Sequence, residues 1–452
     1  MLKKALSEMT NSLSNTFSPA ALFILRKINS QEGAEAYLVG GCVRDYLLGQ
    51  PFADEDICTS LLPEETARLF AAYPQVDKGL KHGTLGVIID GRNYEITSYR
   101  KDGHYRDHRR PDHVEFSRSL AEDLSRRDFT INALALSEAG QVIDPFGGQA
   151  DLKQGVIRAV GDPATRFEED ALRLLRAARF ENRLGFCLDP ATESALRQKA
   201  PLLALIAAER IADEFLKIVD DQPEGVTRLH DLGLLAHMYP ELEVCFRCPQ
   251  ETPYHLYDVG RHSVKAAGFV EGRTLRLAAL AHDLGKPAAK TYGEDGRAHF
   301  YDHAQLSADI APLFLRRLFI PREDISLIRA LVRWHDFLSK KPAKIAQLLR
   351  EEGRTFFELL FPLKRADIYA QSELDRRRKL RLVEEQEAVY RRLAAGPCST
   401  RELAINGQDL IDLGFQGPEI GEILQELLVF VMEKPGRNRH DYLLERVSKW
   451  HC

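Results

Sequence analysis

The chain has 452 residues, with 62 Lys and Arg against 67 Asp and Glu, a net charge of −5 and a hydrophobic content of 44%. This length indicates about three domains. No apolar run reaches the roughly 18 residues that a membrane span requires, and mild acidity argues against a protein that simply coats nucleic acid, although a local basic face could still bind it. Seven cysteines are too few for a disulfide framework, and the N-terminus lacks the apolar core of a signal peptide, so we expect a cytoplasmic protein with no membrane contact.

The first 150 residues combine strand and helix signals. AYLVGG (36–41) predicts a strand that ends in a glycine turn, and TLGVIID with RNYEITSYR (84–100) predicts a hairpin that turns at Gly91. TINALALS and QVIDPF predict a second strand pair. From about Asp151 onward the strand signals nearly vanish, and the apolar period becomes helical. The expected fold is an α+β head, with a small mixed β-sheet and flanking helices, followed by an all-α neck, body and tail.

Breaks in composition divide the helical part of the chain. Together with the change in periodicity they predict four domains: a head over 1–150, a helical neck over 151–245, a helical body domain over 246–370 and a helical tail over 371–452.

The stretch YLVGGCVRD has the features of a phosphate-binding turn. Gly40 and Gly41 lie between a predicted strand and a predicted helix, where backbone N–H groups can approach an anion. Arg44 can reach the same phosphates with a fork of donors.

The acidic stretch ADED that follows predicts a catalytic metal site. Asp54 and Asp56 alternate in an extended segment, so their carboxylates point to one face and can hold a hard cation such as Mg²⁺. Glu95, in the later strand YEITSYR, is expected as a third catalytic carboxylate on that face. Two ions held in this way would stabilise the attacking and leaving oxygens of phosphoryl transfer.

Taken in order, the motifs resemble a known family. GGCVRD with DED resembles the nucleotidyltransferase motif of the polymerase-β superfamily. With RRDFTINALA (126–135), DPFGG (144–148), EDALRLLRAAR (169–179) and NGQDLIDLGFQGPEIGEIL (406–424), the chain resembles class II tRNA nucleotidyltransferases, the CCA-adding enzymes. The resemblance implies addition of C, C and A to tRNA from CTP and ATP, with Mg²⁺ at the head. It also implies nucleotide contacts at Gly41, Arg44, Arg127, Asp170, Arg173, Arg176 and Arg179.

The charged steps in EEDALRLLRAAR suggest how bases are selected. Cytosine and adenine each present an exocyclic amine donor beside a ring-nitrogen acceptor, whereas uracil and guanine present the reverse. Ionised Asp170 only accepts hydrogen bonds and Arg173 only donates them. We expect one helix to hold the two residues a turn apart, so that they match C and A and oppose U and G. The plainer alternative is a solvated helix face with ordinary acid–base pairs.

The other arginines of this region are expected to contact the rest of the nucleotide. Arg176 is expected near the ribose or triphosphate, as are Arg126 and Arg127 before FTINALA. Arg179 is expected only to brace a neighbouring acid, Asp170 or Glu169.

The segment SYRKDGHYRDHRRPDHVEF (98–116) resembles the flexible loop of the family. Such a loop can act as a lever that reshapes the pocket from C to A, and its presence favours A addition; the alternative is a solvated hairpin tip. Bacterial poly(A) polymerases usually carry a GRRF-like stretch after the carboxylates, and KGLKHGTLGV (78–87) stands there instead.

A second group of motifs combines histidines with aspartates at long spacing. Imidazole with carboxylate suits a transition metal. GRHSVKAA, LAHDLGK, FYDHAQ, VRWHDF and RADIYAQ resemble the HD phosphohydrolase superfamily, in which Lys286 also fits the pattern. The expected ligands of a divalent transition metal are His262, His282, Asp283 and Asp367, with His303 and His335 placed for a second ion.

Three functional hypotheses follow. In the first, the chain adds CCA to tRNA, and the helical body and tail bind the acceptor arm through phosphates and shape, with DRRRKLR (375–381) as one contact. In the second, it adds only the final A. In the third, it is mainly a metal-dependent HD phosphohydrolase. No obligate protein partner is expected.

Overall fold

The computed structural model describes residues 13, 15–77, 79–80, 83–102 and 114–449. The chain divides into two compact units, Met1–Phe215 with Asp231–Met238, and Leu216–His230 with Tyr239–Cys452. The sequence predicts four domains, and those finer boundaries remain predictions. None of the described helices combines the length and apolar character needed to cross a membrane.

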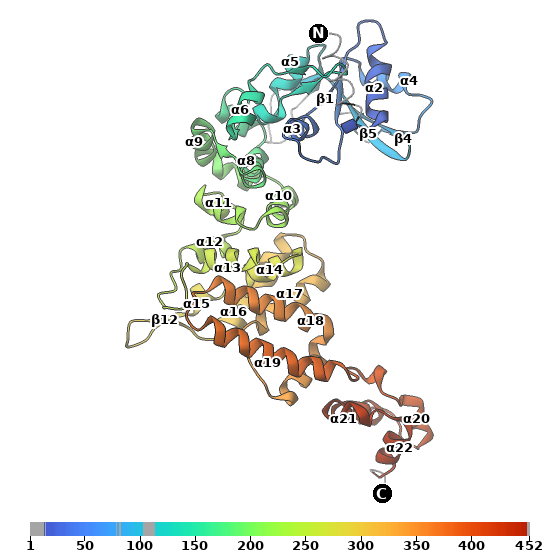
Figure 1. Ribbon diagram of the computed structural model, residues 1–452, viewed down its shortest axis with the longest axis vertical. Helices are drawn as coiled ribbons and strands as arrows, with labels where there is room; N and C mark the ends of the chain where they lie inside the picture. The colour runs from blue at the N-terminus through green and yellow to red at the C-terminus, as the bar shows by residue number, and fades with distance from the viewer. Residues whose placement is uncertain (1–12, 14, 78, 81–82, 103–113, 450–452) are drawn as a thin grey trace. The chain divides into compact units, whose positions relative to one another are not determined.

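The first unit is built on a seven-stranded sheet, part of which is labelled in Figure 1. The strands lie in the order β3 (Gln75–Val76), β4 (Thr84–Ile89), β5 (Arg92–Ser98), β2 (Ile57–Thr59), β1 (Ala36–Val39), β8 (Ala135–Leu136) and β9 (Val142–Ile143). β2 and β5 are parallel and the other pairs are antiparallel, so the sheet is mixed, as predicted.

Helices flank this sheet, which confirms the expected α+β head. They are α2 (Pro19–Asn29), α3 (Gly41–Leu47), α4 (Pro63–Leu69), α5 (Leu120–Ser125) and α6 (Gly148–Gln154). α2 lies against β1 and β2, in the blue part of the chain in Figure 1. One hydrophobic core cluster of the head includes the almost completely buried side chains of Val39, Cys58, Tyr99, Leu124 and Ala133.

The predicted hairpin at Gly91 is confirmed. Ile89 pairs with Arg92, and both turn residues, Asp90 and Gly91, have positive φ (52° and 77°), which is the backbone of a tight two-residue turn. The second predicted strand pair is shorter than expected, because Thr130–Asn132 forms a 3₁₀ turn. The Asp128 carboxylate accepts from the Phe129 amide and the Asn132 side chain there, and this local bonding competes with strand pairing.

Outside the main sheet, the described part of the first unit has two more strand pairs: antiparallel β6 (Arg100–Asp102) with β7 (Val114–Phe116), and parallel β10 (Val156–Ile157) with β11 (Cys187–Leu188). The remainder is mainly helical. Its helices are α7 (Pro163–Glu169), α8 (Leu172–Leu184), α9 (Pro190–Lys199) and the first part of α10 (Ala208–Asp221).

The second unit is helical, as predicted for the later part of the chain. α18 packs against α13 and α19, and α16 packs against α17 (Figure 1). Its helices are α11 (Gly225–Asp231), α12 (Pro240–Phe246), α13 (Val259–Gly268), α14 (Arg273–Ala281), α15 (Lys286–Ala289), α16 (His303–Arg317), α17 (Arg322–Trp334), α18 (Pro342–Ala370), α19 (Arg376–Ala394), α20 (Gly407–Asp412), α21 (Glu419–Glu433) and α22 (His440–Ser448). A hairpin of β12 (Lys290–Tyr292) and β13 (Ala298–Phe300), which the sequence did not predict, lies between α15 and α16.

Candidate nucleotide site and metal centre

The acidic turn before β2 is held by its middle residue. Glu55 is buried, whereas Asp54 and Asp56 are exposed, so the three side chains alternate as the spacing predicts. The Glu55 carboxylate accepts hydrogen bonds from the Ser18 amide (2.7 Å) and hydroxyl (2.6 Å) and lies 3.3 Å from Nη1 of Arg92. Because Ser18 is the N-cap of α2, this contact connects the turn to a helix of the head and fixes the direction of both outer carboxylates.

Glu95 lies beside the two aspartates. The parallel pairing of Ile57 with Ile96 places the residue before β2 next to Glu95, and all three carboxylates line one hollow of about 340 Å³. Desolvation raises the pKa of Asp56, Arg127 opposes that rise, and Glu95 and Asp54 add to it. Three carboxylates at one hollow repel one another, and a divalent cation would stabilise that arrangement.

Gly40 is required by both conformation and space. Its φ is +75°, and a Cβ there would lie 3.0 Å from Nη1 of Arg127 and 3.8 Å from Oδ2 of Asp56. The glycine therefore lets the turn before α3 approach Asp56 of the acidic turn and Arg127 of the RRD motif closely.

A cavity of about 520 Å³ connects these features. Its lining includes every residue that the sequence predicts to bind nucleotide, together with both aspartates of the acidic turn: Gly40, Gly41, Arg44, Asp54, Asp56, Arg126, Arg127, Asp170, Arg173, Arg176 and Arg179. This volume is in the range of small-molecule sites, about 300–1,000 Å³.

Arg44 is buried and braced on two sides. Its Nε and Nη2 donate to the Asp45 carboxylate at 2.8 and 2.9 Å, and its Nη1 donates to Oδ1 of Asn132 at 2.8 Å. Arg126 and Arg127 share the buried carboxylate of Asp123, at 2.7 and 3.4 Å. The carboxylates of Asp45 and Asp123 thus hold the arginines that line this side of the cavity.

The expectation that one helix carries both Asp170 and Arg173 is wrong. α7 ends at Glu169, Asp170 has an extended backbone (φ −139°, ψ 101°), and α8 begins at Leu172. The reason is local: the Asp170 carboxylate accepts from the Leu172 amide at 3.1 Å, an alternative to helical bonding that aspartate favours.

The two residues also have different partners. Asp170 pairs with Arg210 of α10, at 3.0 and 3.3 Å. Arg173 donates to the Glu169 carboxylate (2.7 Å) and to the backbone oxygens of Arg166 (2.9 Å) and Arg126 (2.7 Å). Each is therefore held independently at the same cavity, not as an i, i+3 pair.

Arg179 also differs from its prediction. Its Nε donates to Glu214 of α10 at 2.7 Å, so it does not brace Asp170 or Glu169. Sequence periodicity could not reveal a partner 35 residues away. Arg176 binds Asp128, the acid of the RRD motif, at 2.7 Å.

Several cavity residues were not predicted from the sequence. Asp128 and Asn132 belong to the motif RRDFTINALA (126–135), and their place beside Arg126 and Arg127 in that motif could have indicated them. Phe180 lies beneath the guanidinium groups of Arg44, Arg176 and Arg179, whose central carbons are 4.6–5.3 Å from the ring centroid. Arg183 also lines the cavity, and no sequence pattern distinguished it.

The 98–116 segment is described only at its stem. β6 (Arg100–Asp102) pairs antiparallel with β7 (Val114–Phe116). Residues 103–113, on which the predicted lever depends, lie outside the described residues, so the lever role remains a prediction.

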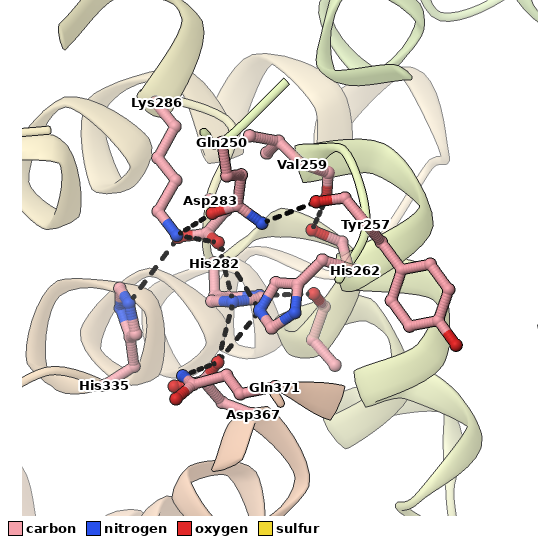
Figure 2. Close-up of polar contacts among 12 residues, drawn as sticks. Gln250, Tyr257, Val259, His262, His282, Asp283, Lys286, His335, Asp367 and Gln371 are labelled. Carbon is pink, nitrogen blue, oxygen red and sulfur yellow. Dashed lines mark hydrogen bonds and ion pairs between the residues drawn. The ribbon is translucent and has the colours of Figure 1, made fainter. Parts of the chain in front are cut away.

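The predicted HD residues come together in the second unit, where Figure 2 labels His262, His282, Asp283, His335 and Asp367. Nε2 of His262 lies 2.9 Å from Asp367, and Nε2 of His282 lies 3.1 Å from Asp283. On the other side of Asp283, Oδ1 lies 3.4 Å from Nε2 of His303 and 3.8 Å from Nε2 of His335. Together with Asp336, these six residues form three overlapping groups whose ligand atoms could hold metal ions.

The orientation of the imidazoles suits metal binding. Nδ1 of His282, His303 and His335 contacts the backbone oxygens of Ala279, Phe300 and Val332, at 2.6–2.8 Å. A proton on Nδ1 leaves Nε2 as the ligand atom, which is the usual outer-shell arrangement around a metal. Within the described chain, both oxygens of Asp283 and Nε2 of His282 are buried with ion-pair contacts but no hydrogen-bond partner.

Charge around this centre is strongly coupled. Burial raises the pKa of Asp283, but the nearby charges of His282 and Lys286 lower it by more. The resulting pKa of Asp283 is well below its usual range. Burial lowers the pKa of His303, but Asp283 and Asp336 raise it to about 10. Asp336 lies 3.1 Å from His303. It is the aspartate of the motif VRWHDF, but it is not among the ligands expected from the sequence.

A cavity of about 350 Å³ opens at this centre and contains two lysines. Lys286 lies 2.7 Å from Asp283, and Lys379 comes from the basic run DRRRKLR in α19. His299 and Tyr301 stack with ring centroids 5.4 Å apart at the same cavity. Within the basic run DRRRKLR, Lys379 therefore lies at the HD cavity. Arg378 instead forms an ion pair with Asp375, and Arg376 donates to the backbone oxygen of Gln371.

Comparison with known families defines the class of each part. The chain matches the poly A polymerase head domain over residues 36–158, the probable RNA and SrmB- binding site of polymerase A over 185–246, and the HD domain over 253–371. Fold and sites thus combine a nucleotidyltransferase head with helical regions and an HD centre.

Individual relatives narrow the assignment. The chain is 54% identical over 214 residues to the CCA-adding enzyme of Anoxybacillus flavithermus and 50% identical over 220 residues to that of Geobacillus kaustophilus. These alignments cover 47–48% of this chain and 53–54% of the relatives, so the chain spans about half the length of the curated relatives it matches. The crystal structure of the Bacillus stearothermophilus CCA-adding enzyme in complex with CTP matches with a TM-score of 0.68 at 31% identity, over 96% of this chain and 100% of that one. The chain belongs to the CCA-adding enzyme family.

Proposed function

We propose that this protein adds C, C and A in turn to the 3′ end of tRNA, with CTP and ATP as substrates and no nucleic-acid template. One observation carries the proposal: the acids Asp54 and Asp56 line the same cavity as Asp170 and Arg173. Groups suited to phosphoryl transfer and groups suited to reading a base therefore share a space of nucleotide size. The structures of relatives with CTP, ATP and tRNA support these partners.

The proposed chemistry is an in-line nucleotidyl transfer. The 3′-hydroxyl of the RNA releases its proton to water while its oxygen forms a bond to the α-phosphorus of the bound triphosphate. The bond from that phosphorus to the oxygen that bridges it to the β-phosphate breaks, and pyrophosphate leaves. Asp54 and Asp56, with Glu95 beside them, would hold Mg²⁺, which supplies charge stabilisation at the attacking and leaving oxygens. Glu55 keeps these carboxylates directed into the cavity through its bonds to Ser18.

The cationic side of the cavity would bind the triphosphate. Arg126 and Arg127 are held by Asp123, and Arg176 is held by Asp128, so their positions are fixed before substrate enters. Preorganised donors stabilise developing charge without reorganisation at the moment of reaction.

Asp170 and Arg173 would select the base. A carboxylate acceptor beside a guanidinium donor matches the amine and ring nitrogen shared by C and A. U or G would place acceptor against acceptor and donor against donor, which costs the full desolvation of each unpaired group. The helix break at Asp170 supports this role, since it turns the carboxylate to the cavity that Arg173 also lines.

The acidic turn provides the direct test. Asp54→Ala or Asp56→Ala should abolish nucleotide addition and leave tRNA binding nearly intact, measured by primer extension and by filter binding on the same preparation. Loss of tRNA binding in both variants would contradict a metal-holding role. The proposed setting is the cytoplasm, where tRNA and both triphosphates are available, and no protein partner is required for the reaction.

A second activity is favoured by a separate observation. Imidazole Nε2 atoms and three aspartates converge in the HD centre, with Lys286 and Lys379 at its cavity. His262, His282, Asp283 and Asp367 would hold one divalent transition metal, and His303 and His335 a second; the metal would supply an activated water. Hydrolysis of phosphoesters at this centre is the second candidate function, and addition of A alone is the second candidate at the head.

A further inference from the structure

Arg210, near the start of α10, is the principal side-chain partner of Asp170. Its Nη2 donates to Oδ2 of Asp170 at 3.0 Å and its Nη1 donates to Oδ1 at 3.3 Å. Both side chains are mostly buried, at 25% and 20% exposure. Two parallel N–H donors on one carboxylate fix the plane of that carboxylate as well as its position.

Asp170 depends on this support because its own backbone gives little. Asp170 is not in a helix, and in the part of the chain that the structure describes the one other hydrogen bond to its carboxylate is from the Leu172 amide to Oδ1, at 3.1 Å. The terminal torsion of an aspartate is broad, so a single bond leaves the carboxylate plane free to rotate. Arg210 supplies two of the three donors that stop this rotation.

The same bonds decide which oxygen can read a base. A carboxylate offers about four acceptor positions, two on each oxygen. Among the described residues, Oδ1 accepts from Leu172 and Arg210, whereas Oδ2 accepts from Arg210 only. These contacts leave one acceptor position on Oδ2, and Asp170 and Arg173 line the same cavity.

We propose that Arg210 is a positioning residue for nucleotide selection: it holds the Asp170 carboxylate so that Oδ2 presents one acceptor to the exocyclic amine of cytosine or adenine. This inference rests on the proposed function. Arg210 is not among the residues that line the nucleotide cavity, so its loss should change selectivity more than it changes the chemical step.

The test compares Arg210→Gln with Arg210→Lys and with a matched control, Arg197→Gln. Arg197 also forms an ion pair within the first unit, 2.6 Å from Glu193, but it does not line the cavity. Single-nucleotide extension of a tRNA transcript would give kcat and KM for CTP and for UTP. Arg210→Gln should lower the CTP-to-UTP ratio of kcat/KM by about tenfold, because a charged hydrogen bond no longer orients the carboxylate. Arg210→Lys should show a smaller fall, since lysine keeps the charge but not the fork.

The outcomes separate the inference from the function on which it rests. No C addition by the wild-type protein would reject the proposed function and leave no selectivity to compare. Wild-type addition with a CTP-to-UTP ratio within twofold of normal in folded Arg210→Gln would overturn the role of Arg210. An equal fall in Arg197→Gln would also overturn it, because loss of an ion pair anywhere in the unit would then be sufficient. If Arg210→Gln does not fold, an unchanged ratio in folded Arg210→Lys overturns the inference.

Discussion

Removing Arg173 is expected to relax selection against U and G more than it weakens triphosphate binding. Its guanidinium is buried and donates to Glu169, to the Arg166 backbone and to the Arg126 backbone. These three bonds use three of its five N–H donors and leave two for a base. A hydrogen bond from a charged donor contributes about 1.5–3 kcal/mol, so Arg173→Ala should lower the preference for CTP over UTP by about 10- to 150-fold.

The assay is steady-state extension of a tRNA transcript with each of the four triphosphates, with kcat and KM reported separately. Arg166→Ala is the matched control, because Arg166 also binds Glu169, at 2.7 Å, but does not line the cavity. The control should keep wild-type selectivity. An Arg173→Ala protein that binds CTP weakly yet still rejects UTP as the wild type does would refute base reading by this residue, and the arginine would then be a triphosphate contact.

Two further predictions concern pH and metal. Burial raises the pKa of Asp128, but Arg176 and the Asn132 amide lower it to about 2 overall. Because this folded pKa is below the usual value, the carboxylate should contribute about 2–3 kcal/mol of stability that is present above pH 4 and lost as the pH falls toward 2. Asp128→Asn should therefore lower Tm at pH 6, and the difference from wild type should narrow between pH 4 and pH 2; a constant difference would be inconsistent with this linkage. His282→Ala should abolish binding of Mn²⁺ or Ni²⁺ at the HD centre, measured by calorimetry, and leave nucleotide addition unchanged; full metal binding by the variant would remove His282 from the ligand set.

Much of the head could be predicted because its signals are local. The Gly91 hairpin follows from two adjacent strand patterns and a residue that accepts positive φ. The alternation of Asp54, Glu55 and Asp56 follows from an extended backbone. The motif order also predicted which residues line one cavity, although it did not predict their hydrogen-bond partners.

The failures arise where a side chain bonds across the fold or competes with the backbone. Helical periodicity across Asp170 was broken by its own carboxylate, which caps Leu172. Arg179 pairs with Glu214, 35 residues later in the chain, and Asp170 pairs with Arg210, 40 residues later. Both partners lie on α10. No local pattern encodes such partners, because they depend on how the helices pack.

In the HD centre the sequence predicted which histidines and aspartates cluster, but not that Asp283 is shared between two groups of histidines. Spacing could not show that Asp283 lies between two histidine groups, close to His282 on one side and to His303 and His335 on the other. That arrangement requires α14, α16 and α17 to meet, which is a property of tertiary packing.

The most direct test of the account is single-nucleotide extension of two tRNA transcripts, one ending at the discriminator base and one ending in CC, with Mg²⁺ and each triphosphate in turn. The account predicts two C additions and then one A on the first transcript, one A on the second, and no extension by UTP or GTP. Extension of only the CC-ended transcript, by one A, would contradict full CCA addition and make the protein an A-adding enzyme. Extension of neither transcript would contradict nucleotidyl transfer to tRNA and leave the HD centre as the main chemistry.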